Sequence, residues 1–222
     1  MGSKVYFDTV ASEWSEMRKA FFSEAIREKA FAAVNLEAGK LAADIGAGAG
    51  FISLALADMG VKVIAVDQSE AMLLELSKKH LQSGEIDCRP GDAEQLPIEN
   101  ESVDYTFANM SLHHVESPAA AIKEMTRILK PEGMLVITDL DRHDVEFLRR
   151  EHHDRWLGFE REDIKNWFVD AGLTSVTVDD AGGNCCTDSC QTAASASVSI
   201  FLASGKKVKT IAKKPDWGSS NG

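Results

Sequence analysis

The sequence has no long apolar run and too few basic residues to balance its acidic ones. No stretch approaches the roughly 18 to 20 apolar residues that a membrane-spanning helix needs. The 222 residues contain 24 Lys and Arg against 35 Asp and Glu, which gives a formal net charge of −11. Phosphate backbones and anionic lipid surfaces repel such a chain, so we expect no nucleic-acid partner and no membrane insertion.

Cysteine is also scarce, with four residues. The first ten residues, MGSKVYFDTV, contain no hydrophobic signal segment, so we expect a cytoplasmic location. Thiols remain reduced in that compartment, which argues against a disulfide framework. Nothing in the composition indicates an oligomeric state.

Apolar strand patterns alternate with helical patterns along most of the chain. The sequence predicts one or two helices over 10–33, strands at 41–45, 61–66, 85–89, 103–108 and 133–139, and helices at 51–59, 69–81, 118–130, 143–156 and 160–171. This alternation is typical of right-handed crossovers in a doubly wound sheet. Two further strand patterns, LTSVTVDD and SASVSIFLASG, have no helix between them and should pair antiparallel.

We therefore predict an α/β fold with a doubly wound, Rossmann-like, seven-stranded sheet. The sheet should be mostly parallel, with an antiparallel last strand and helices on both faces. One domain should span residues 1–205, with residues 1–38 as an N-terminal helical lid, and a polar tail should follow over 206–222.

A glycine-rich turn, DIGAGAG at 44–50, follows the first predicted strand and opens a helix. A dinucleotide-binding turn would place its third glycine at position 51, which is Phe51. Asp44 would repel a phosphate but would accept from an ammonium group. The second strand ends at Asp67, 21 residues beyond Gly46, where an acid reaches a ribose diol. The pattern predicts a ligand with a ribose and a cationic amino-acid end but no phosphate.

With these features the sequence resembles the class I S-adenosylmethionine-dependent methyltransferases. The resemblance is to the small-molecule branch that contains the quinone-biosynthesis and arsenite methyltransferases. It rests on five blocks in family order: YFDTVASEW, AADIGAGAGFISLALA, VIAVDQSEAML, GDAEQLPIENESVDYTFANMSLHHV and EMTRILKPEGMLVITDL. It implies S-adenosylmethionine as cofactor, a small-molecule acceptor, and a final strand that runs antiparallel inside the sheet.

The resemblance also implies which residues hold the cofactor. These would be Gly46, Gly48 and Gly50 on the methionine moiety, Asp44 near its amino group, Asp67 on the ribose, Gln68 beside the adenine, Asp92 on the adenine amine with Ala93 next to it, Asn109 near the sulfonium, and Tyr6, Phe7 and Trp14 closing over them. Simpler readings stay open, because the glycine turn could be a connector, Asp92 a turn residue, and the three aromatic residues ordinary packing.

Methyl transfer from a sulfonium is an in-line displacement that mainly needs alignment and exclusion of water. A base is needed only when the acceptor carries a proton. The candidates follow the carboxyl ends of late strands, where open α/β sheets bind ligands: His114 after the fourth strand, and Asp139 and His143 after the fifth. A structural role stays open for each. We expect His152 and His153 to lie on a solvated helix.

The long connection between the last two strands contains Cys185, Cys186 and Cys190. Three thiolates within six residues can converge on a soft metal or metalloid ion. Arsenite methyltransferases also gather thiolates, although these cysteines cannot be matched to theirs residue by residue. A redox-labile pair of Cys185 with Cys190 and an incidental flexible loop are the alternatives.

The sequence thus predicts an S-adenosylmethionine-dependent methyltransferase that acts on a small molecule. One alternative is methylation of a soft acceptor, such as arsenite or a thiol, through the cysteine loop. The other is a module that binds the cofactor or a metal without turnover.

Overall fold

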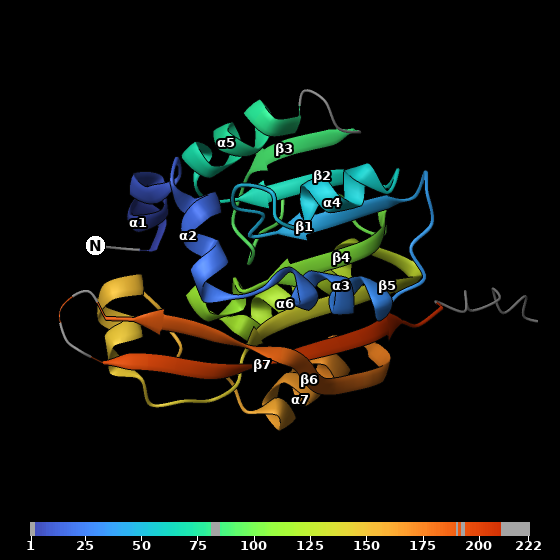
Figure 1. Cartoon of the computed structure of the whole chain (residues 1–222). Coiled ribbons are helices and arrows are strands. Elements are labelled where there is room, and N and C mark those ends of the chain that lie inside the picture. Colours follow the sequence, from blue (N-terminus) through green and yellow to red (C-terminus); the bar gives the residue numbers. More distant parts are fainter. Residues whose placement is uncertain (1–2, 81–84, 190, 192–193, 210–222) are drawn as a thin grey trace, which may run out of the picture.

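The computed structural model describes residues 3–80, 85–189, 191 and 194–209 (Figure 1). Its helices are α1 (Ser3–Val10), α2 (Trp14–Phe21), α3 (Glu24–Ala32), α4 (Ser53–Asp58), α5 (Glu70–His80), α6 (Pro118–Ile128) and α7 (Arg161–Asp170), with the short turns η1 (Leu112–His114) and η2 (Leu148–His152). Its strands are β1 (Leu41–Ile45), β2 (Lys62–Asp67), β3 (Ile86–Pro90), β4 (Val103–Asn109), β5 (Leu129–Leu140), β6 (Leu173–Asp188) and β7 (Ser195–Lys207).

The seven strands form one sheet in the order β3-β2-β1-β4-β5-β7-β6. Strands β1 to β5 are all parallel to one another, and β7 runs antiparallel between β5 and β6. The predicted fold class is confirmed. The strand order reverses between β1 and β4, and this is where a doubly wound sheet opens a crevice for ligands at its carboxyl edge.

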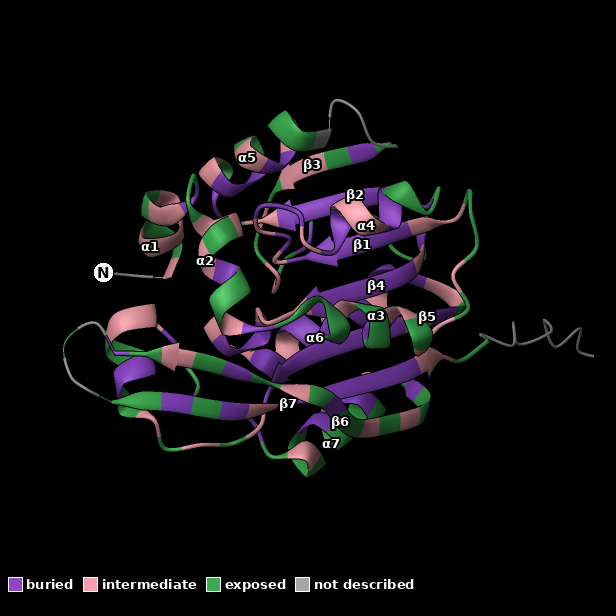
Figure 2. Cartoon of the chain, viewed as in Figure 1, coloured by how far each residue is buried: buried purple, intermediate pink, exposed green. Residues whose placement is uncertain are grey.

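Helices cover both faces of the sheet, as predicted. One core packs α3, α4 and α5 against the sheet, with fully buried Ile26 and Leu76. The other core packs α6 and α7 against the opposite face, with fully buried Met125 and Phe168. Figure 2 shows the central strands buried along nearly their whole length. Burial on both faces explains why these strands read as continuous apolar runs in the sequence.

The N-terminal segment forms three short helices, starting at Ser3 rather than at residue 10. The break between α2 and α3 falls at Phe22, whose backbone is extended and whose ring packs 5.5 Å from that of Phe51. Tertiary packing of this side chain therefore overrides a stretch that lacks any helix breaker.

Two expectations for the C-terminal part are wrong. Instead of a helix over 143–156, the chain makes only the five-residue η2, which ends at His153 in a left-handed conformation with φ 61°. Instead of a long loop over 181–194, β6 continues to Asp188 and pairs with β7 from Ser195. This two-stranded ribbon extends beyond the carboxyl end of β5, toward α2 and η2 (Figure 1).

Among the described residues, no helix is long and apolar enough to cross a membrane. Strand β7 runs to Lys207, two residues into the predicted polar tail. Residues 210–222 of that tail lie outside the described part of the chain.

Candidate functional site

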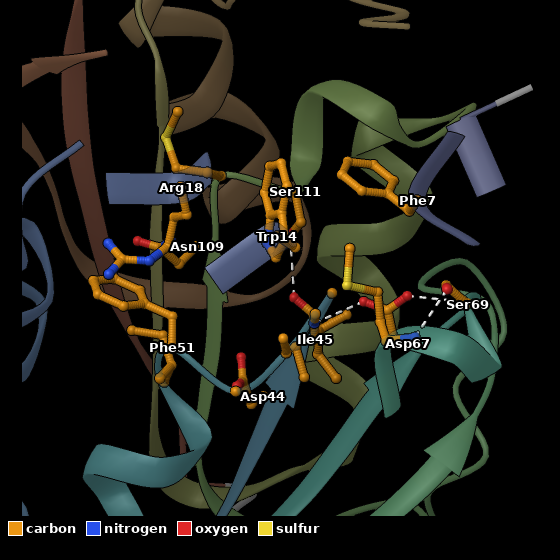
Figure 3. Close-up of a pocket in the computed structure, with 18 of the residues that line it drawn as sticks. Phe7, Trp14, Arg18, Asp44, Ile45, Phe51, Asp67, Ser69, Asn109 and Ser111 are labelled. Atoms are coloured by element: carbon orange, nitrogen blue, oxygen red, sulfur yellow. Dashed lines mark hydrogen bonds between the residues drawn. The ribbon is translucent and has the colours of Figure 1, made fainter. Parts of the chain in front are cut away.

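A cavity of about 440 Å³ opens at the carboxyl ends of β1, β2 and β4, beneath α1 and α2 (Figure 3). Ligand pockets for small molecules commonly measure about 300 to 1,000 Å³. The structure brings most of the predicted cofactor residues into this cavity, namely Asp44, Gly46, Gly48, Gly50, Asp67, Gln68, Ala93 and Asn109. Phe7, Trp14 and His114 line it as well.

The three glycines of the turn all have positive φ, at 70° for Gly46, 52° for Gly48 and 96° for Gly50. A Cβ on Gly46 would lie 2.7 Å from Ser111 Oγ, and a Cβ on Gly50 would collide with Leu76. Side chains are disfavoured here by both backbone and space, so the turn requires glycine. The resulting bare backbone lets a ligand approach the start of α4 closely.

Asp67 ends β2 and organises the turn from the other side. Its Oδ2 accepts from Gly48 N at 2.8 Å, and its Oδ1 accepts from Ser69 N at 2.8 Å (Figure 3). Burial raises the pKa of this carboxyl group. Each carboxylate oxygen has a second lone pair, so Asp67 can still accept from two hydroxyl groups of a ligand in the cavity.

Asp44, the penultimate residue of β1, lines the cavity and is 1% exposed. Its Oδ2 accepts from Ser53 Oγ at 2.5 Å. Burial raises the pKa of Asp44 to about 7. A cationic group nearby would favour its ionised form, so this acid fits an ammonium group of the ligand.

Two of the predicted cofactor residues lie outside this cavity. Asp92 is exposed, and its Oδ1 accepts from Glu94 N at 2.9 Å, although its neighbour Ala93 lines the cavity. Tyr6 lines an adjoining smaller cavity instead. The sequence did not single out Ser111, which also lines this cavity and lies against Gly46. The two residues are far apart in the chain, so only the tertiary fold shows that they are neighbours.

Arg18 also lines the cavity, although the sequence did not single it out as a site residue. It is 8% exposed, and its guanidinium carbon lies 4.0 Å from the centre of the Phe51 ring. No sequence signal separates this arginine from a solvated one, because its burial depends on how α2 crosses the glycine turn.

The smaller cavity measures about 50 Å³ and adjoins the first, since both are lined by Phe7, Trp14, Phe22, Met110 and His114. Its polar wall consists of His113, His152, Asp154 and Cys185. Three of these residues, His152, Asp154 and Cys185, come from the segments whose structure the sequence did not predict, and His152 lines the cavity instead of lying on a solvated helix.

Asp139 is fully buried, and its carboxylate holds the loop that carries the histidines. Its Oδ2 accepts from Leu112 N at 2.9 Å and from His113 N at 3.3 Å, and its Oδ1 lies 2.7 Å from His113 Nδ1. Asp139 lines neither cavity. The structure therefore places this predicted catalytic residue in a positioning role.

His113 lies between two carboxylates, with Nδ1 on Asp139 and Nε2 3.7 Å from Asp154 Oδ1. Burial alone would lower the pKa of His113, but the two carboxylates outweigh it and raise the pKa to about 9. Burial raises the pKa of Asp154 to about 6.

His114 points into the space shared by both cavities. Burial, followed by the charge of His113, lowers the pKa of His114 well below its ordinary value. Its Nδ1 is shielded from solvent and has no hydrogen-bond partner within the described part of the chain. His143, by contrast, lines neither cavity, and its Nδ1 accepts from Val145 N at 3.2 Å.

The structure does not bring the first two loop cysteines together. Cys185 and Cys186 are neighbours on β6, so their side chains point to opposite faces of the ribbon. Cys185 is buried, and burial raises its pKa to about 12, whereas Cys186 is exposed and donates to Ser197 Oγ at 3.6 Å. Cys190 lies outside the described residues, so a ligand role for it remains a prediction.

Comparison with known proteins identifies the domain. Residues 43–137 match the family model described as a methyltransferase domain. The chain is 35% identical over 114 residues to a demethylmenaquinone methyltransferase from Clavibacter sepedonicus, covering 51% of this chain and 46% of the relative. It is 32% identical over 151 residues to a ubiquinone biosynthesis O-methyltransferase from Stutzerimonas stutzeri, covering 61% of this chain and 65% of the relative.

A solved S-adenosylmethionine-dependent methyltransferase from Aquifex aeolicus has the same fold. It superposes with a TM-score of 0.65 at 21% identity, over 89% of this chain and 98% of that one. These findings bear out the predicted resemblance: residues 43–137 match a methyltransferase domain, the chain is similar to quinone-biosynthesis methyltransferases, and it shares the fold of an S-adenosylmethionine-dependent methyltransferase. The chain spans from about half to about two thirds of the two curated relatives.

Proposed function

We propose that this chain uses its methyltransferase domain to transfer a methyl group from S-adenosylmethionine to a small molecule bound beside His114. The proposal is carried by the contiguity of the two cavities. One presents the glycine turn, Asp44 and Asp67, and the other opens from it at His114. Donor and acceptor would then meet at a shared wall, as an in-line displacement requires.

The larger cavity fits the cofactor on observations of this chain alone. Among the described residues no cation pairs with the buried carboxyl group of Asp44, Asp67 offers further lone pairs, and a cavity of about 440 Å³ lies beside the bare backbone of the turn. S-adenosylmethionine, when bound, supplies a methyl group on a positively charged sulfur. Asp44 would hold its ammonium group and Asp67 its ribose hydroxyls.

Aromatic side chains of the N-terminal helices would exclude water. Phe7 and Trp14 pack edge to face at 5.2 Å between ring centres, and both line both cavities. A Cβ on Gly48 would lie 3.5 Å from Trp14 Nε1, so this indole covers the turn directly. We propose that residues 1–38 act as a lid over the site, as the sequence predicted.

On the acceptor side, His114 is the predicted catalytic residue that reaches the cavity. An acceptor that carries a proton, such as a hydroxyl group or a carbon acid, would meet the unpartnered Nδ1 of His114. Asp139 would keep the loop in place. The separation of Cys185 from Cys186 gives the soft-acceptor alternative no support, and the net charge of −11 favours a small molecule over nucleic acid.

The test has two stages. Isothermal titration with S-adenosylhomocysteine should show one site per chain, and a labelled-methyl assay over hydroxyl, amine, carboxyl, quinone, thiol and arsenite acceptors should reveal a product. His114→Ala should lower turnover more than His153→Asn, which removes a neighbouring imidazole outside both cavities. Failure to bind the nucleoside would refute the proposal, and binding without a product from any acceptor would favour the non-catalytic module.

A further inference from the structure

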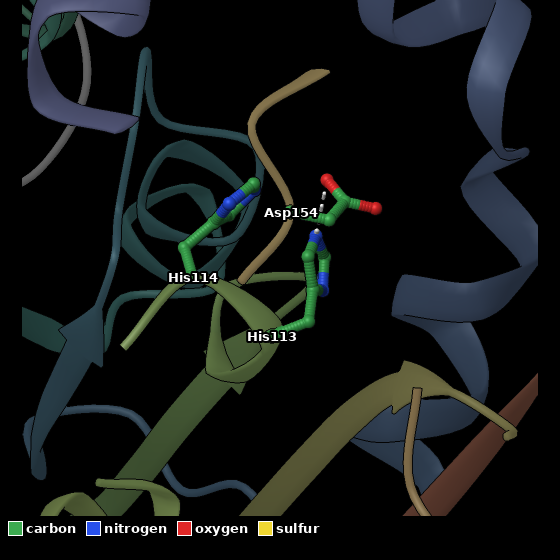
Figure 4. Close-up of side chains that lie close together, drawn as sticks. All are labelled: His113, His114 and Asp154. Atoms are coloured by element: carbon green, nitrogen blue, oxygen red, sulfur yellow. Dashed lines mark ion pairs between the residues drawn. The ribbon is translucent and has the colours of Figure 1, made fainter. Parts of the chain in front are cut away.

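Three residues that line the smaller cavity, from two separate parts of the chain, offer metal-ligand atoms. His113 and His114 come from η1 after β4, and Asp154 comes from the segment after η2 (Figure 4). Each offers one ligand atom, and these atoms all lie within 4.8 Å of one another. We propose that His113 Nε2, His114 Nδ1 and Asp154 Oδ1 bind a divalent transition-metal ion, with Zn²⁺ as the best match.

The spacing suits such an ion. Tetrahedral Zn²⁺ with nitrogen and oxygen ligands at about 2.0 to 2.1 Å places neighbouring donors roughly 3.3 Å apart. His113 Nε2 and Asp154 Oδ1 are already 3.7 Å apart. Side-chain movements of about an ångström would bring the remaining donor atoms to this spacing. All three residues line a cavity of about 50 Å³, which has room for an ion.

His113 is oriented as metal-binding histidines usually are. Its Nδ1 lies 2.7 Å from Asp139 Oδ1, which keeps the Nδ1 proton in place, while Nε2 faces Asp154 and would release its own proton when the ion binds. Metal-ligating histidines characteristically donate their other ring N–H to a carboxylate in this way. Asp139 is in turn fixed by Leu112 N and Leu140 N, at 2.9 and 2.7 Å.

An independent observation comes from His114. Its Nδ1 is buried and has no hydrogen-bond partner among the described residues, an arrangement that costs free energy unless something binds there. This unpartnered Nδ1 is the ring atom that we assign to the proposed ion.

Three protein ligands leave one coordination position open, as in catalytic rather than structural zinc sites. That position faces the cavity in which the acceptor would bind, so the ion could hold an oxygen or sulfur atom of the acceptor. This last step rests on the proposed function. With the ion bound, His114 is a ligand rather than a proton acceptor, and the metal content of the active protein separates the two roles.

The experiment uses the full chain after treatment with a chelator and dialysis. Titration with ZnCl₂ should give one ion per chain, and Co²⁺ should produce the visible absorption of a four-coordinate site. Altering a residue that only supports a metal ligand typically costs 10- to 100-fold in affinity, so His114→Ala and Asp154→Asn should each weaken Zn²⁺ binding by at least about 100-fold. Asp154→Asn keeps the shape of the buried side chain, and His153→Asn is the matched control because asparagine tolerates its left-handed backbone.

The proposal is overturned if the chelator-treated parent chain binds no stoichiometric Zn²⁺, or if both variants bind Zn²⁺ as tightly as the parent chain. It is also overturned if His153→Asn weakens Zn²⁺ binding as much as His114→Ala and Asp154→Asn do. Binding of S-adenosylhomocysteine by Asp154→Asn is measured alongside, because Asp154 does not line the larger cavity. Loss of zinc with retained nucleoside binding then reports on the metal site alone. A parent chain that binds zinc but no nucleoside would refute the proposed function and leave the metal site standing.

Discussion

Asp67→Ala tests the cofactor site most directly, because Asp67 serves both the turn and the ligand. The substitution removes the acceptors of Gly48 N and Ser69 N, each at 2.8 Å, together with the lone pairs proposed for the ribose. Hydrogen bonds to a charged group contribute about 1.5 to 3 kcal/mol each. Two such bonds to the ribose therefore amount to about 3 to 6 kcal/mol of binding free energy.

Water can enter the space left by the deleted carboxylate and satisfy part of what is lost, so we take the lower end of this range. A loss of about 3 kcal/mol corresponds to a dissociation constant raised about 100-fold. Asp67→Asn should weaken binding similarly, because its amide NH₂ would face Gly48 N–H or Ser69 N–H, which are both donors.

The assay is isothermal titration with S-adenosylhomocysteine, which cannot react further, with thermal unfolding of each variant measured in parallel. Asp58→Ala is the control because it removes the same charge from an exposed position at the end of α4. An Asp67→Ala protein that remains folded and binds within a few-fold of the parent would refute the ribose assignment. Equal weakening by Asp58→Ala would show instead that net charge alone governs affinity.

Three further outcomes are expected. Gly46→Ala should destabilise the fold by about 1 to 3 kcal/mol in urea unfolding, because its Cβ would crowd Ser111 at a positive φ, and Ser111→Gly should restore only the part due to crowding. Cofactor affinity should rise from pH 5.5 to pH 8, because the ammonium group binds the ionised form of Asp44 and the pKa of about 7 leaves Asp44 protonated at the lower pH. In Asp44→Asn, the cofactor affinity measured by isothermal titration should not change over this pH range. Phe168→Ala, in the core beneath α7, should cost about 3 to 5 kcal/mol of unfolding free energy while leaving nucleoside affinity intact in native buffer.

The sheet and the cofactor half of the site were predictable because their signals are local. Strand β1 was placed at its observed bounds, since a parallel strand buried on both faces is a continuous apolar run. Asp44 and Asp67 lie at the carboxyl ends of β1 and β2, and the glycine turn directly follows β1, so their positions at the crevice follow from the strand order. Helices were predicted over 10–33, but α1 was missed, and the break between α2 and α3 depends on the packing of Phe22 on Phe51.

The antiparallel pairing of β6 with β7 was predicted, but the extension of this ribbon beyond residue 180 was not, because half of its signal is missing. In β7 the alternation is clear, with Ala196, Val198 and Ile200 buried and the serines between them more exposed. In β6 beyond residue 180, the buried positions are Ala181 and Cys185, a spacing of four that a bulge between Asp180 and Asn184 produces. Glycines and short polar residues there are typical of a loop, and only pairing with β7 makes this segment a strand.

The two halves of the site therefore have different physical origins. The cofactor half is made by turns that the sheet topology brings together, whereas the acceptor half depends on η2 and the ribbon, which bring Asp154 and Cys185 to His113 and His114. Charge explains why the segment after η2 stays folded inward rather than continuing as a solvated helix, since the buried carboxylate of Asp154 lies 3.7 Å from the imidazole that Asp139 holds in place. Because Asp154 and Cys185 line the smaller cavity and not the larger one, substitutions in these segments should change the proposed acceptor while the proposed cofactor contacts of β1 and β2 stay as they are.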